Sequence, residues 1–254
     1  METLMATFCN AVSPDREEEM NNWYTWVHIR DVMSMDGSSI AVQRFELDTS
    51  QPENADLSRK FLALYEVADK AICSDRHMTW QQTLKLEISS SFDLRTFSEA
   101  YWDPTYGTAA FSAYADYAGD KSVLMVRLDG KERVEAMLTL ESLEELAALP
   151  GIKAAHLFCY GADQMPTSAA GTETMSHMLV AQLDDSACAA ASWNAFAAEK
   201  QLSTLQAKPV IYRPIIDRFH ADERIKSPEW RAITYLSHAI LGTSEKSAVF
   251  GSRK

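Results

Sequence analysis

A histidine flanked by a phenol and a carboxylate at helical spacing is the part of this sequence best suited to chemistry. Tyr24 precedes His28 by four residues and Asp31 follows it by three. Residues three and four apart share one face of a helix, so these side chains are expected to line one stripe. Imidazole, with an ordinary pKa of about 6.5, exchanges protons near neutrality. We predict that His28 is a general acid or base, that Asp31 fixes its tautomer, and that Tyr24 or Asn10 donates to a developing oxyanion.

A structural role accounts for the same residues without catalysis. Helices also carry histidine for packing, and Asp31 could serve only a surface charge pair with the neighbouring Arg30. A match to a motif is a hypothesis. Spacing alone therefore leaves both interpretations open.

Further side chains are predicted to bind a substrate beside His28. A small-molecule pocket needs apolar and aromatic walls with a few polar groups, although aromatic rings of this kind also fill cores. Asn10 is predicted to hydrogen-bond the substrate, and Arg44 to hold an anionic group on it. The predicted binding residues are Asn10, Trp23, Arg44, Tyr65 and Trp80, and the rings of Trp26, Tyr101 and Trp102 are further candidates for the wall.

Other reactive residues are weaker candidates. Cys73 and His77 stand four apart and could form a thiol with its base, but such pairs are common by chance. His156 and His177 lack an identifiable third metal ligand, and the four cysteines show no CxxC spacing. Nucleotide-binding glycine motifs and the GxSxG elbow are absent from the sequence. We therefore predict no metal site and no cofactor.

Composition restricts the partners. Lys and Arg total 24 against 36 for Asp and Glu, a net charge of −12 that repels nucleic acid and anionic lipid. The same charge also serves as a plain solubility device. The sequence shows neither a signal peptide nor an apolar run of membrane-spanning length. We expect a cytoplasmic protein with a small apolar or aromatic substrate, no nucleic-acid or membrane partner, and a homodimer as an option.

The first half of the chain predicts a strand, a helix, two strands, a helix and a strand. Ser13 and Pro14, followed by acidic residues, are typical of a helix start, with Ser13 as the capping hydroxyl. Pro104 is expected to break the last strand. The predicted ranges are strand 3–9, helix 15–35, strand 40–47, strand 61–67, helix 69–88 and strand 96–106.

The same order then repeats. The second half predicts strand 122–128, helix 132–149, strands 152–160 and 178–183, helix 186–200 and strand 210–216. This β-α-β-β-α-β order is the split βαβ, or ferredoxin-like, arrangement. An α+β protein with two such repeats is expected to pack sheet to sheet as a fused barrel with its helices outside. The predicted domains are 1–118, 119–219 and a tail, 220–254, with a helix over 229–241.

The segment from Asn10 to Gly37 resembles the EthD-like group of dimeric α/β barrel proteins. The resemblance rests on Asn10, Trp23, Tyr24, His28, Ile29, Asp31, Val32, Gly37, Arg44 and Phe45, with the later FLALYEV as the third strand. Arg30 departs from the pattern, which usually has proline there. Superposing the turns at Gly37 and Gly151 puts Ser142 at the position of His28, so the second half looks like a degenerate structural copy.

The resemblance implies one working pocket in a fused barrel. Our leading hypothesis is a cofactor-independent acid/base enzyme, a lyase, dehydratase, cyclase or isomerase, acting on a small aromatic or polyketide-like carbonyl or hydroxyl compound. One alternative is a non-catalytic binding or oxygenase-accessory protein of EthD type. Another is a cofactor-free monooxygenase or a haem-binding barrel, for which His28, His77 or His156 would have to face an open cleft.

Overall fold

A computed structural model gives the arrangement of most of the 254 residues. It describes residues 3–35, 39–50, 59–83, 88–114, 120–163, 175–205 and 208–220. The helix predicted over 229–241 lies outside these ranges.

Eight antiparallel strands form a closed barrel. Their order is β3, β1, β4, β6, β7, β5, β8, β2, and β2 pairs back onto β3. A short strand, β9 (Phe219–His220), also pairs with β2. The barrel strands are β1 (Thr3–Cys9), β2 (Ser39–Leu47), β3 (Phe61–Val67), β4 (Ser98–Gly107), β5 (Val123–Leu128), β6 (Ile152–Asp163), β7 (His177–Leu183) and β8 (Pro209–Pro214).

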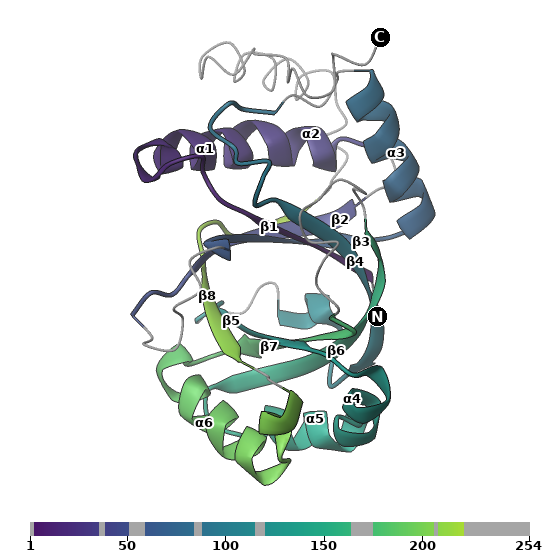
Figure 1. Ribbon diagram of the computed structural model, residues 1–254, viewed down its shortest axis with the longest axis vertical. Helices are drawn as coiled ribbons and strands as arrows, with labels where there is room; N and C mark the ends of the chain where they lie inside the picture. Colours follow the sequence, from purple (N-terminus) through teal and green to yellow (C-terminus); the bar gives the residue numbers. More distant parts are fainter. Residues whose placement is uncertain are drawn as a thin grey trace.

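Helices cover the barrel on two opposite sides (Figure 1). One side carries α1 (Glu17–Trp23), a π-helix (Tyr24–His28), α2 (Ile29–Met33) and α3 (Lys70–Gln82). The other carries α4 (Lys131–Met137), α5 (Leu140–Ala147) and α6 (Ser186–Glu199). Three 3-10 turns complete the described elements: Pro14–Arg16, Phe111–Tyr114 and Leu202–Leu205. The predicted α+β class and the barrel with outer helices are confirmed.

The two halves have corresponding strand orders. The first runs β4, β1, β3, β2, and the second runs β8, β5, β7, β6. Pairing of β4 with β6 and of β2 with β8 joins them into one barrel. One chain therefore closes a barrel by itself.

Alternation along the strands divides the buried side chains into three cores. Because successive strand residues point to opposite faces, one set fills the barrel and the other meets the helices. The barrel interior includes Phe8, Phe45, Trp102, Phe158 and Tyr212. We call the helix-facing core of the first half the first layer, and that of the second half the second layer.

Several local expectations were wrong in detail. The helix predicted over 132–149 is split, because Thr139 accepts from the Ser142 amide and starts α5 as a new helix. Ser13 makes no such capping hydrogen bond. Strand β4 continues through Pro104 and absorbs it in a register shift toward β6.

Candidate active site

A π-helical turn places the aromatic side chains above the first sheet. Hydrogen bonding from residue i to i+5 widens this turn, so the residue five positions back also approaches His28. The His28 ring lies 4.9 Å from the Trp23 ring and 4.8 Å from the Tyr24 ring, between centroids. A regular helix would bring only Tyr24 into this contact. The predicted grouping of Trp23, Tyr24 and His28 is therefore present, through a local geometry that the spacing did not reveal.

His28 points into the first layer. The side chain is partly buried overall, and its Nδ1 is fully buried without a hydrogen-bond partner among the described residues. Burial, followed by the nearby His77 and Arg44, lowers the pKa of His28 to about 3. The imidazole is therefore neutral at pH 7 and can both donate and accept a hydrogen bond.

Polar residues line the sheet beneath the π-helix. Strand pairing puts Glu99, Thr7, Ala63 and Arg44 in one row across β4, β1, β3 and β2. Adjacent strands are about 4.8 Å apart, so the ends of this row are separated by about 14 Å. A carboxyl group and a guanidinium group thus stand at opposite ends of a row with small residues between them.

The neighbouring row adds two phenols. It consists of Tyr101, Met5, Tyr65 and Val42. The Tyr65 hydroxyl donates to the Tyr24 hydroxyl over 3.3 Å, which links the sheet to the π-helix. Burial raises the pKa of the Tyr24 and Tyr65 hydroxyls. Both therefore stay protonated at neutral pH.

Arg44 is a fully buried cation with neutral hydrogen-bond partners. Its Nη1 donates to Asn21 O (3.2 Å) and Thr25 Oγ1 (2.9 Å), and its Nη2 to Asn21 Oδ1 (2.7 Å). The guanidinium carbon lies 4.3 Å from the centroid of the Tyr24 ring. Its Nε has no hydrogen-bond partner among the described residues. A buried donor left open on a cation favours an anionic or strongly polar ligand group.

Asn10, one of the predicted site residues, lies apart from this group. Its side chain accepts from the Lys60 amide (2.8 Å) and donates to Thr96 (3.4 Å), so it anchors loops at the end of β1. Asp31 is buried in α2. Control of the His28 tautomer by Asp31 stays a prediction.

The remaining aromatic candidates divide between three places. Trp80 packs at the edge of the first layer, whereas Trp26 is 51% exposed and stacks with Arg30. Tyr101 belongs to the first layer and Trp102 to the barrel interior.

Cys73 and His77 are in contact but poorly suited to nucleophilic chemistry. The distance from Cys73 Sγ to His77 Nδ1 is 3.5 Å. Burial raises the pKa of Cys73 to about 11 and lowers that of His77 to about 4. Both groups are neutral at pH 7, so the pair holds no thiolate.

Two further histidines, His156 and His177, lie in the second half. His156 faces the barrel interior, where its Nε2 lies 3.3 Å from Gln182 Oε1 and its ring packs on Phe111. His177 approaches Glu135 of α4 at 3.7 Å. No group of three or more metal-binding side chains occurs in the described part of the chain.

Glu99 is the residue that sequence reasoning missed. It is 6% exposed, and Thr7 Oγ1 donates to its Oε2 over 2.8 Å. Burial raises the pKa of Glu99 to about 7, even though the Thr7 hydrogen bond lowers it. The available signal was a hydroxyl within the apolar first strand and a carboxyl at the matching position of the fourth. Only the strand register brings these two residues together.

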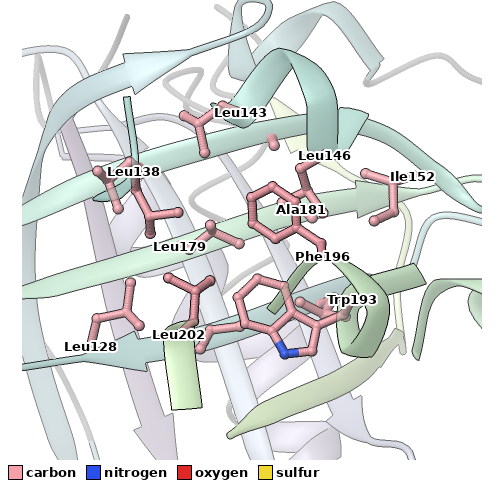
Figure 2. Packing of buried hydrophobic residues seen from close by; sticks show 14 of the residues in the cluster. Leu128, Leu138, Leu143, Leu146, Ile152, Leu179, Ala181, Trp193, Phe196 and Leu202 are labelled. Carbon is pink, nitrogen blue, oxygen red and sulfur yellow. The ribbon is translucent and has the colours of Figure 1, made fainter. Parts of the chain in front are cut away.

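The two corresponding strand rows of the second layer carry no such polar side chains. Its corresponding rows are Pro209, Val126, Leu179, Leu157 and Ile211, Leu124, Ala181, Ala155. Trp193, Phe196 and several leucines pack onto them from the helices (Figure 2). Ser142, the predicted counterpart of His28, is occupied with the cap of α5. Titratable side chains therefore occur in the two strand rows of the first layer and not in the corresponding rows of the second.

Two small cavities open at the barrel. One of about 30 Å³ is bordered by Gln43, Phe111, Lys121 and Lys153, among others. Another of about 20 Å³ lies between Phe8, Arg59, Arg127 and Tyr212. Within the described ranges, no helix combines the length and apolar character needed to cross a membrane.

Comparison with known proteins identifies the fold. No family model and no curated protein sequence matches the chain. An anthrone oxidase-like protein of known structure is 12% identical, covering 86% of this chain and 92% of its own, with a TM-score of 0.51. The chain has the dimeric α/β barrel fold. A haem-binding protein from Thermus thermophilus is 8% identical over 92% of this chain and 95% of its own, but its TM-score of 0.39 supports no inference.

Proposed function

We propose that the first layer binds a small aromatic or polyketide-like carbonyl or hydroxyl compound and moves a proton on it without a cofactor. The supporting observation is the difference between the two layers. The second layer packs on apolar strand rows, so the fold does not require the buried Arg44 and Glu99 of the first. Burying such groups is unfavourable for stability, and function is the usual reason to retain them.

The side chains have distinct roles in this proposal. Trp23, Tyr65 and Trp80 supply the apolar wall, and the open Nε of Arg44 holds an anionic oxygen of the substrate. The neutral His28 and Tyr24 hydrogen-bond the oxygen on which charge develops when carbon loses a proton. A low pKa makes His28 a weak base. Its role is therefore to donate or accept a hydrogen bond, and not to take the proton from the substrate. The reaction class is a lyase, dehydratase, cyclase or isomerase step.

The domain boundaries belong to the same proposal. Residues 1–118 form the working ferredoxin-like repeat, 119–219 a degenerate structural repeat, and 220–254 a tail. The EthD-like assignment rests on the residues from Asn10 to Gly37, and a homodimer of the fused barrel is part of the proposal. Sedimentation at two protein concentrations tests the dimer.

Hydrogen exchange at carbon tests the proposed chemistry without knowledge of the natural substrate. 2-Tetralone, an aromatic ketone with acidic hydrogens beside its carbonyl, is incubated with the protein in D2O and followed by proton NMR. We expect the hydrogens beside the carbonyl to exchange for deuterium faster than in buffer alone. In a double variant that combines Tyr24→Phe and His28→Gln, this rate should fall at least tenfold. Exchange at the buffer rate with this ketone and with a panel of phenols, lactones and aromatic acids, together with no bound ligand, would contradict the proposal.

A cofactor-free oxygenase is the second candidate. It would begin with the same proton removal, after which dioxygen would oxidise the carbanion. The aromatic wall of the first layer suits the flat phenolic compounds on which such chemistry is possible. Oxygen uptake measured with 1,8-dihydroxyanthrone as probe separates this oxygenase from the acid/base enzyme, which consumes no oxygen. Ligand binding with neither exchange nor uptake would instead indicate the binding or accessory role.

A further inference from the structure

The buried carboxyl group of Glu99 differs in its partners from three other buried carboxyl groups. Asp48, Asp93 and Glu66 are paired with Arg213, Arg95 and Arg218. Among the described residues, Glu99 has one hydrogen bond, from the neutral hydroxyl of Thr7, and no ion pair. An unpaired buried carboxyl group destabilises a fold. Its retention therefore needs a reason other than stability.

The position of Glu99 places it at the reacting end of the first layer. It stands in the same sheet row as Arg44, three strands away. A substrate oxygen held at Arg44 would direct the rest of a small molecule along this row, over Ala63 and toward Glu99. The Thr7 hydroxyl occupies Oε2 and orients the carboxyl group, and the described contacts leave Oε1 open to a ligand.

We propose that Glu99 is the general base of the first layer and that Thr7 is its positioning residue. This inference rests on the proposed function. The Glu99 carboxylate forms an O–H bond to the hydrogen beside a substrate carbonyl, and the C–H electron pair moves into the enolate. His28 and Tyr24 stabilise the enolate oxygen, while Arg44 holds a separate anionic oxygen of the natural substrate. The carboxyl group then returns its proton to carbon, or in D2O exchanges it with solvent and returns a deuteron.

Electrostatics agree with this role. The pKa of Glu99 is raised to about 7 by burial, so at neutral pH both forms are populated, as efficient general bases require. Titratable groups face it from each neighbouring element: Cys9 on β1, Tyr65 on β3, Tyr24 on the π-helix, Cys73 on α3 and Tyr101 on β4. The pKa of each of these five groups is raised, so all remain neutral while Glu99 titrates. The pH dependence should therefore follow one ionisation.

The test compares exchange into 2-tetralone in the unaltered 254-residue protein and its variants. Glu99→Gln, which keeps the shape and the Thr7 hydrogen bond, is expected to lower the exchange rate at least a hundredfold at pH 8. Glu99→Asp should recover part of it. Ser98→Ala, one residue away on the same strand but facing the barrel, is the matched control and should exchange normally.

The positioning role has its own readout. In the unaltered protein, the exchange rate should rise with pH to a plateau, with its midpoint near neutrality. Thr7→Val removes a hydrogen bond that favours the carboxylate, so the midpoint should move upward. Thr7→Ser keeps that hydrogen bond and should restore the midpoint. A merely structural role for Thr7 would lower the rate without moving the midpoint.

The outcomes separate this inference from the proposed function. Exchange by Glu99→Gln at the unaltered rate would overturn the role of Glu99 and leave the first layer as the site. Carbon-13 NMR of labelled glutamate supplies a second measurement, in which the Glu99 carboxyl signal should titrate near neutral pH. Titration at the pH of an ordinary surface glutamate would also overturn the inference. Exchange at the buffer rate by the unaltered protein with 2-tetralone and with the panel of phenols, lactones and aromatic acids, together with no bound ligand, would overturn both proposals.

Discussion

The two helix-covered faces of the barrel share a strand order but not a chemistry. In the first, the row through Thr7 contains Glu99 and Arg44; in the second, the row through Val126 contains only apolar residues. Helices pack on both faces, so either filling is compatible with the fold. The comparison shows that the polar groups of the first layer are an addition to the fold and not a requirement of it.

Placing an arginine at the position of the second half that corresponds to Arg44 should give the largest loss of stability. Leu157 stands at the place in its row that Arg44 holds in the first. Leu157→Arg would bury a guanidinium group without partners, which costs several kcal/mol, so we expect a protein largely unfolded at 25 °C. Circular dichroism during urea titration measures this.

The matched change is Arg44→Leu. Replacing a buried charge by an apolar group is often neutral or stabilising, so this variant should fold with a loss below about 2 kcal/mol. Equal destabilisation by the two substitutions would mean that the polar first layer is structural.

Glu99→Gln should change stability in a pH-dependent way. Between pH 4.5 and about 7, the folded protein holds a proton on Glu99 that the unfolded chain has released, so stability falls as pH rises through this window. Glutamine removes this loss, which corresponds to up to about 3 kcal/mol. Urea unfolding should show the variant more stable than the parent at pH 8 and similar to it at pH 5. A constant difference at both values would contradict a buried, titrating Glu99.

His28→Gln should alter the pH dependence of stability in the opposite direction. The pKa of His28 is lowered to about 3, so the unfolded chain binds a proton below pH 6.5 that the folded protein excludes. The contribution of His28 to the stability of the folded protein is complete above pH 6.5 and is lost as pH falls toward 3. At pH 5 the loss is about 2 kcal/mol relative to pH 7, and the variant should lack it. His77 is present in both proteins, so their difference isolates His28; parallel curves would place the His28 ring in solvent.

Removing the hydroxyl at a helix start should give the smallest difference in stability between the two halves. Thr139 caps α5, and Thr139→Ala should cost about 1 kcal/mol in thermal or urea unfolding. Ser13 makes no capping hydrogen bond, so Ser13→Ala should stay within about 0.5 kcal/mol of the parent. A loss of about 1 kcal/mol from Ser13→Ala would show that the first helix is capped in solution.

The sequence predicts the elements better than the site. Strand Phe61–Val67 follows from an apolar run bounded by polar segments, and the helix from Glu17 to Met33 from its acidic start and apolar spacing. Periodicity does not reveal the π-helical turn, because one extra residue per turn is set by packing on the sheet. It also suggests Asp31 as the partner of His28, which stays a prediction.

Glu99 illustrates the limit most clearly. Its neighbours in sequence, Ser98 and Ala100, carry no chemical signal, and its partner Thr7 is 92 residues away. Their meeting depends on the register of β1 with β4, which no local pattern specifies. The sequence predicts Arg44 as an anchor for a substrate anion, but its burial beneath Tyr24 is likewise a property of the folded sheet.

The most direct test of the account is a crystal structure of the protein soaked with 2-tetralone or a hydroxylated aromatic acid. We predict ligand density in the first layer, between the π-helix and the row from Glu99 to Arg44, with the ketone or phenolic oxygen toward Tyr24 and His28 and the acidic carbon toward Glu99. The carboxylate of an aromatic acid should lie toward Arg44. Density confined to the barrel interior or to the second layer would contradict the claim that the first layer is the working site.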